Sequence, residues 1–102
     1  MKTITTGVEL IAQERKRQIE SEGWTAEHDS KHSDGELANA AALYAMTDDM
    51  REYIDDNWGN DQWLNFWPFS LNWLKFSPED RIKQLSKAGA LIVAEIDRLT
   101  NK

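Results

Sequence analysis

The sequence predicts an all-α fold, a small helical bundle of three main helices plus a short helix and a tryptophan-rich loop. Apolar residues recur at helical spacing near both ends of the chain, and an alanine-rich stretch at 34–47 favours a third helix. The 102 residues suffice for a single modest core but not for two. We therefore expect one all-α domain over residues 1–102.

The first helix is expected from about Thr6 to Ser21. Thr6 and Glu9 stand in a capping-box pattern, in which a hydroxyl and a carboxylate satisfy free amide groups at a helix start. Residues that share one face then follow at helical spacing: Val8, Ile11, Ala12, Arg15 and Ile19. Gly23 is a natural C-terminal cap.

Ser33 and Glu36 repeat the capping-box pattern and open a second helix, which we expect from Asp34 to about Thr47. Its alanines favour helix and let a neighbouring backbone approach closely, which predicts tight helix–helix contact. The stretch from Thr47 to Asp61 is acidic, and a short helix is expected at 49–56. Residues 57–76 hold four of the five tryptophans, and Pro68 prevents a continuous helix through them.

The last helix is expected to start at Ser77 and Pro78, because serine can cap a helix and proline suits its first position. Apolar positions then alternate three and four apart along it: Ile82, Leu85, Gly89, Ile92, Ile96 and Leu99, with Ala88 and Leu91 widening the stripe. This stripe predicts a seam packed against another helix, either within the domain or across a dimer. We therefore expect a homo-oligomer with the last helix at or near the interface.

Composition and motifs disfavour several classes of protein. The chain has no cysteine, so a disulfide framework and a thiolate metal site are excluded. No apolar run approaches the ~20 residues of a membrane span, and the first residues show no signal-peptide pattern. We therefore expect a cytoplasmic protein without a membrane partner. A net charge of −6 opposes a phosphate backbone, so a nucleic-acid partner is not expected.

A polar cluster precedes the second helix. His28, His32 and Glu36, with Asp29 between the histidines, supply nitrogen and oxygen ligands at close spacing. Imidazole and carboxylate together suit zinc, manganese or iron, and carboxylate alone suits magnesium. The alternative is that these groups cap the helix and hold the connector together by hydrogen bonds.

Carboxylates on the three main helices are candidate catalytic groups. Glu14, Glu36 and Glu95 lie one on each helix, and a helical nucleotide pyrophosphohydrolase needs several inward carboxylates to hold Mg²⁺. The alternative is that these residues are surface glutamates, and Glu36 is also explained as the capping-box partner of Ser33.

Trp24, Arg17 and Trp67 are the candidate substrate-binding residues, since aromatic faces can stack a nucleotide base. The alternative is that the tryptophans form the core or a subunit interface. No GxGxxG, P-loop or GxSxG pattern is present, so dinucleotide-binding, Walker-type and serine-hydrolase functions lack support.

Four segments of the chain resemble a group of small phage and prophage proteins. They are ERKRQI from Glu14, EGWTAEHDSKH from Glu22, GELANAAALY from Gly35 and KAGALIVAEIDRL from Lys87. The group typically shows ER-x-RQI, EGWT-x-EHD, GELA-x-AA and a late Trp-Pro-Trp stretch, which stands here as Trp67-Pro68-Phe69. The resemblance implies a phage origin and hence the cytoplasm of the host bacterium.

The layout of that group is similar to the all-α nucleotide pyrophosphohydrolases of the MazG kind, which carry ExxE on one helix and ExxD on another as a Mg²⁺ site. In this sequence the residue three positions after each glutamate is not acidic: Arg17 follows Glu14, Asn39 follows Glu36 and Arg98 follows Glu95 at that spacing. The leading hypothesis is a nucleotide-handling protein that binds or hydrolyses a nucleotide, or another small phosphorylated ligand, with Mg²⁺ or Mn²⁺. The alternative is a non-enzymatic acidic protein that modulates a host protein through its acidic stretch and tryptophans, and that changes near Asp55 or Trp63 would disable.

Overall fold

The structure is a computed structural model, and it describes residues 5–23, 35–77 and 79–100. It confirms the all-α fold, and the described residues form helices and loops without a strand. The helices are α1 (Gly7–Glu22), α3 (Glu36–Ala45), α4 (Asp48–Trp58) and α5 (Arg81–Thr100), with two short 3₁₀ helices, η1 (Gln62–Phe66) and η2 (Leu71–Trp73). Within these ranges, no helix has the length and apolar character needed to cross a membrane.

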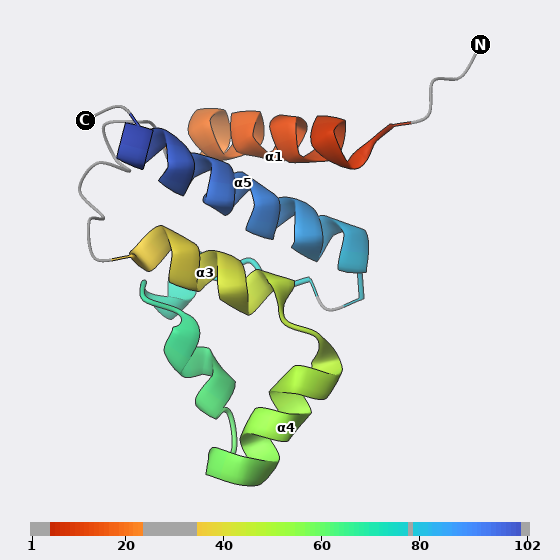
Figure 1. Cartoon of the computed structure of the whole chain (residues 1–102), viewed down its shortest axis with the longest axis vertical. Coiled ribbons are helices and arrows are strands. Elements are labelled where there is room, and N and C mark those ends of the chain that lie inside the picture. Colours follow the sequence, from red (N-terminus) through yellow and green to blue (C-terminus); the bar gives the residue numbers. More distant parts are fainter. Residues whose placement is uncertain (1–4, 24–34, 78, 101–102) are drawn as a thin grey trace.

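Helix α5 lies between α1 and α3, and both pack against it (Figure 1). Alanines on α3 and α5 let the two backbones approach closely, so the tight helix contact predicted for the alanine-rich stretch is confirmed. The buried core gathers on this contact: Leu37, Ala40, Ala41, Leu43, Tyr44, Trp67, Ala88, Leu91 and Ala94.

Both predicted ends of α1 are confirmed. Thr6 Oγ1 accepts a hydrogen bond from the Glu9 amide at 3.2 Å, and Glu9 Oε1 accepts one from the Thr6 amide at 3.2 Å. Gly23 ends the helix with a φ of 72°, in the left-handed region that glycine adopts without strain.

The start of α5 differs from the prediction. Asp80, and not Ser77, caps the helix, because Asp80 Oδ1 accepts from the Lys83 amide at 3.0 Å. A turn precedes the helix, in which the Asp80 amide donates to the Ser77 carbonyl at 3.0 Å. Ser77 is instead tied to the body of the helix, since its amide donates to Gln84 Oε1 at 2.8 Å. Pro78 lies outside the described residues.

The buried face of α5 also differs from the prediction. The apolar stripe at 82–99 is only partly buried. Ala88 and Leu91 lie in the core and Gly89 packs against Ile11 of α1, whereas five of its residues are exposed: Ile82, Leu85, Ile92, Ile96 and Leu99. The helix also buries Gln84, Lys87, Ala90 and Ala94. Alanines permit the close approach of α3, while the loop at 75–77 supplies hydrogen-bond partners for Gln84 and Lys87. The predicted seam within the domain therefore involves only part of the stripe.

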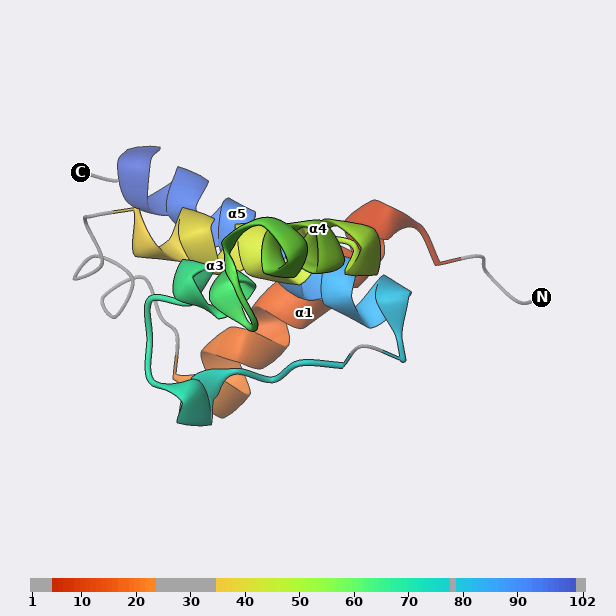
Figure 2. The ribbon, with the colours of Figure 1, turned by 90° about the horizontal axis from the view of Figure 1, so that it is seen from below.

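Helix α4 and η1 form an arm, residues 48–66, that leads away from the α1–α5–α3 layer (Figures 1 and 2). Thr47 caps α4 by accepting from the Met50 amide at 3.1 Å, and the helix is longer than the predicted 49–56. After Gly59 the chain turns through Asp61, whose φ is 61°, and η1 folds back on α4. The arm thus presents a concave surface between two helices.

Candidate functional site

Glu14 and Arg17, two of the predicted site residues, form one ion-paired cluster on α1. Arg17 Nε donates to Glu14 Oε1 at 2.8 Å, and Arg17 Nη2 donates to Glu14 Oε2 at 2.6 Å and to Glu22 Oε2 at 3.1 Å. The side chains of Glu14 and Glu22 are each only 10% exposed. The hydrogen bond to Glu14 raises the pKa of Arg17 further, so the guanidinium stays charged between the two carboxylates.

The cluster continues towards the core through Gln18, the buried residue of α1. Gln18 Nε2 donates to Glu14 Oε2 at 3.3 Å, while Gln18 Oε1 has no hydrogen-bond partner among the described residues. The cluster is therefore anchored in the protein interior on one side and open to solvent at Arg17 on the other.

Tyr44 and Lys87 extend the polar network to α3 and α5. The Tyr44 hydroxyl accepts from the Lys75 amide at 2.9 Å, and Lys87 Nζ donates to the Lys75 carbonyl and to Ser77 Oγ. Burial raises the pKa of Tyr44 to about 12, against the lowering effect of the Lys75 hydrogen bond. Burial, followed by the charge of Lys83, lowers the pKa of Lys87. These contacts fasten the loop at 75–77 to both helices.

Glu95 makes a second carboxylate–arginine pair at the other end of α5. Arg98 donates from Nε to Glu95 Oε1 at 2.7 Å and from Nη2 to Glu95 Oε2 at 3.3 Å. This hydrogen bonding raises the pKa of Arg98, and the charge of Glu36 adds to the effect. The negative charge of Glu36 on α3 therefore helps to keep the Arg98 guanidinium on α5 protonated.

The structure gives each of Glu14 and Glu95 an arginine partner in place of a second carboxylate. In both helices the arginine lies three residues after the glutamate. It binds the carboxylate in a bidentate manner, with one hydrogen bond to each oxygen. Within the described ranges, no three His, Asp or Glu side chains lie close enough together to hold a metal ion. Glu14, Glu36 and Glu95 are thus not gathered into a ligand group.

The other half of the predicted metal site is not covered by the structure. Trp24, His28, Asp29 and His32 lie outside the described residues, so a metal site built from the histidines, Asp29 and Glu36 stays a prediction.

Trp67, predicted to stack a substrate base, is a core residue. It is 6% exposed, and the rings of Tyr44 and Phe69 pack against it in edge-on geometry at 5.6 and 5.4 Å. Its Nε1 donates to the Ser70 carbonyl at 2.9 Å. Because its faces are covered, the core alternative holds for Trp67 in this structure.

A groove lies between α4 and η1 of the arm. It has a volume of about 450 Å³, and its lining is mainly apolar, including Met50, Tyr53, Ile54, Trp58, Gln62 and Phe66. Four of these side chains are between 41% and 65% exposed: Met50, Tyr53, Trp58 and Phe66. Tyr53 and Trp58 also contact each other edge-on, with ring centroids 5.9 Å apart. We call this surface the aromatic groove.

The sequence pointed to part of the aromatic groove only. Trp58 and Phe66 belong to the tryptophan-rich stretch, whose aromatic faces were expected to stack a base, but the sequence did not indicate Met50 or Tyr53 as binding residues. Met50, Tyr53, Ile54 and Trp58 recur three or four apart on α4, which is the signal that indicates a single helix face.

The arm also concentrates the charge of the chain. Residues 48–61 hold six of the 18 acidic residues and one of the 12 basic residues, a local charge of −5. The rest of the chain then has 12 acidic and 11 basic residues, a charge of −1. The aromatic groove therefore lies within the one strongly acidic part of the molecule.

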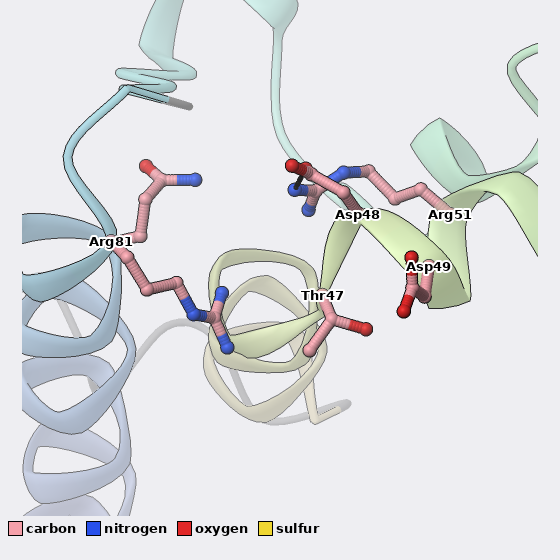
Figure 3. Close-up of a pocket in the computed structure, with 6 residues that line it drawn as sticks. Thr47, Asp48, Asp49, Arg51 and Arg81 are labelled. Carbon is pink, nitrogen blue, oxygen red and sulfur yellow. Dashed lines mark hydrogen bonds and ion pairs between the residues drawn. The ribbon is translucent and has the colours of Figure 1, made fainter.

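Arg51 of α4 and Arg81 of α5 connect the arm to the rest of the domain, and Figure 3 shows both side chains beside a pocket at the N-terminus of α4. Arg51 Nη1 and Arg81 Nη1 both donate to the Met46 carbonyl, at 2.9 and 3.0 Å, and so satisfy the C-terminal end of α3. The Arg51 guanidinium also lies over the rings of Phe76 and Trp63, 4.7 and 5.4 Å from their centroids. A hollow of about 340 Å³ separates the N-terminus of α4 from Arg81. The arm thus has a defined orientation relative to α5.

Comparisons of the chain with protein-family models, with curated proteins and with solved structures found no match.

Proposed function

We propose that this protein is a non-enzymatic interaction protein, which uses the aromatic groove to bind a basic segment with apolar anchors in another protein. The observation that carries the proposal is the position of the groove, since its large exposed side chains lie inside the part of the chain that holds a charge of −5. An exposed apolar patch with a polar rim is typical of protein–protein contact sites.

The residue types in the groove support a protein partner. Trp, Tyr and Met are enriched in interfaces, and aromatic anchors carry much of the binding free energy. Met50 and Trp58 line the ends of the α4 face, and Phe66 faces them from η1. A helix or extended segment with two or three apolar side chains would fill such a groove, as in other cases of helix-in-groove recognition.

The acidic residues of α4, the helix that forms one wall of the groove, define the chemistry of that partner. Asp49, Glu52 and Asp56 are exposed on α4. They would attract a segment rich in lysine and arginine and repel an acidic one, which raises the association rate and sets specificity. The partner is therefore a basic segment, and binding weakens as salt is added.

The state of the carboxylates supports binding over catalysis. A Mg²⁺ ion at Glu14 would have to displace Arg17, which occupies both oxygens of that carboxylate. Arg98 occupies Glu95 in the same way. The resemblance to phage and prophage proteins adds that the partner is a protein of the host bacterium, and that the binding takes place in the bacterial cytoplasm.

Capture from a bacterial lysate tests the proposal. Immobilised wild-type protein is compared with Trp58→Ala, and with Trp73→Ala as a control that removes an exposed tryptophan outside the groove. Capture is repeated at about 0.1 M and about 1 M salt, where the Debye length falls from about 10 Å to about 3 Å. We expect the wild type and Trp73→Ala to retain the same protein at low salt, and Trp58→Ala to lose it. Retention of that protein by Trp58→Ala at both salt concentrations would contradict the proposal.

Nucleotide handling is a second candidate, favoured by the hollow of about 340 Å³ beside Glu14 and Arg17. Lys83 and Ser86 of α5 also line this hollow, so it offers two cations and a hydroxyl to a phosphate. A thermal-shift series with nucleotides, with and without Mg²⁺ or Mn²⁺, tests it, because a ligand that binds the folded state raises the melting temperature. A metal-dependent shift that is lost in Glu14→Gln would favour this candidate over the interaction protein.

A further inference from the structure

The exposed large apolar residues fall into two groups of different chemistry. Those at 50–73 are mainly aromatic and belong to the acidic arm and the loop after it. Those on α1 and α5 are all aliphatic: Val8, Ile19, Ile82, Leu85, Ile92, Ile96 and Leu99. The second group lies on the α1–α5 side of the molecule, and none of its residues lines the aromatic groove.

The exposed aliphatic residues of α5 form two groups on one side of the helix. Ile82 and Leu85 lie near its N-terminal end, and Ile92, Ile96 and Leu99 in its C-terminal half, each between 45% and 64% exposed. Between the two groups, Gly89 packs against Ile11 of α1, so the C-terminal group lies beside the surface of α1.

An apolar hollow lies beside the stripe. It has a volume of about 420 Å³ and is lined by Val8, Ile11, Ala12 and Arg15 of α1 and by Val93 of α5. Val8 at its edge is 80% exposed. One copy of the chain therefore carries protruding aliphatic side chains and an aliphatic recess on the same pair of helices, which is the requirement for a self-complementary, two-fold interface.

We propose that the exposed face of α5, with the adjoining hollow on α1, is the interface between two copies of this chain. The charges along the stripe permit this pairing. Its exposed residues are uncharged, and Glu95 is paired with Arg98 of its own helix. The aliphatic residues of two copies therefore bring no like charges together, whereas two acidic arms would repel each other.

The area needed by a stable dimer explains why both helices take part. An α-helix of 20 residues is about 30 Å long and about 10–12 Å wide, so one face of α5 offers roughly 300–360 Å². A standard interface buries about 800 Å² on each partner. The stripe alone is too small, so the α1 surface around Val8 and Ala12 is part of the interface.

Sedimentation velocity tests the mass directly. We expect the wild type to sediment at twice its chain mass of 11.8 kDa. Ile92→Glu should remain helical by circular dichroism, because Ile92 is half exposed in one copy. It should raise the dimer dissociation constant by about a hundredfold or more, as two uncompensated charges would enter the interface. The matched control Met50→Glu changes an equally exposed residue in the aromatic groove and should leave the dimer intact.

Disulfide cross-linking keeps the test decisive if Ile92→Glu fails to fold. The chain has no cysteine, so a single introduced cysteine reports only on contact between copies. Ile92→Cys should give covalent dimers on mild oxidation, whereas Tyr53→Cys, which is of similar exposure on α4, should not. A wild-type monomer by sedimentation, or equal cross-linking at the two positions, would overturn the proposal.

Discussion

The side chain of Ile11 on α1 occupies the space that a Cβ atom at position 89 of α5 would need. A Cβ atom built on Gly89 would lie 2.5 Å from Ile11 Cδ1 and 2.6 Å from Ile11 Cγ1, far inside van der Waals contact. Glycine within a helix costs about 1 kcal/mol relative to alanine. That cost is offset here because α1 can cross α5 at close range.

We predict that Gly89→Ala lowers the stability of the protein. The added methyl group must push Ile11 away, and overpacking of this kind costs about 1–3 kcal/mol, more than the ~1 kcal/mol gained in helix propensity. Urea unfolding measures the change. In an Ile11→Ala background, where the space is open, the same substitution should be neutral or stabilising. A Gly89→Ala protein more stable than wild type would show that α1 does not dock at this point.

Tyr44 should make the protein unstable at high pH. Its folded-state pKa is raised from 10.0 to about 12, so the fold favours the protonated hydroxyl. The resulting stability is complete below pH 10 and is lost as the pH rises through about 12, a loss of at most about 3 kcal/mol. Tyr44→Phe should be less stable at neutral pH by about 1–2 kcal/mol, since the Lys75 amide loses its acceptor.

The free energies of unfolding of wild type and Tyr44→Phe should therefore converge between pH 10 and pH 12, because only the wild type has a hydroxyl at position 44 to ionise. Tyr53→Phe is the control, because it removes the exposed tyrosine and leaves Tyr44 in place. A constant difference in the free energy of unfolding between wild type and Tyr44→Phe across this range would show that burial does not raise the pKa of Tyr44.

Arg17→Gln should destabilise the protein at neutral pH by about 1–3 kcal/mol, below the full cost of breaking a buried pair because Arg17 is partly exposed. The change leaves Glu14 and Glu22 close together without their shared cation. Urea unfolding at neutral pH measures the loss. Lys16→Gln is the control, since Lys16 is 79% exposed and 3.9 Å from Glu20. If both variants lost equally little stability, the cluster on α1 would have no structural role.

Asp80→Ala should cost about 0.5–2 kcal/mol, the usual effect of removing a helix cap, whereas Asp80→Asn should cost little. The reason is the hydrogen bond from the Lys83 amide to Asp80 Oδ1. Chemical denaturation of the two variants measures the difference. Equal stability of Asp80→Ala and Asp80→Asn would mean that α5 is capped elsewhere.

Local signals in the sequence predicted the parts of the fold that depend on neighbouring residues. The Thr6–Glu9 cap, the stop at Gly23 and the alanine-rich contact all follow from short-range rules. The buried face of α5 could not be predicted in this way. Periodicity identified the aliphatic stripe, but the same pattern describes a core seam and an interface, and only the packing of α3 distinguishes the two.

The candidate site residues were likewise predictable only where they depend on neighbours in the sequence. The spacing of Glu14 and Arg17 on one helix already allowed an ion pair, and the structure forms it. The aromatic groove instead depends on tertiary structure, because Phe66 comes to lie opposite Trp58 only after the chain turns at Gly59 and Asp61. No periodicity within α4 reveals that second wall.

The most direct test of the interaction account is the binding of a fluorescently labelled amphipathic peptide of lysine and leucine, followed by anisotropy. The account predicts equal affinity for wild type and Trp73→Ala, and an affinity at least about tenfold lower for Trp58→Ala, since a central anchor contributes more than about 1.4 kcal/mol. Added salt should weaken binding to the wild type. Equal affinity of Trp58→Ala and wild type for the peptide would contradict the account.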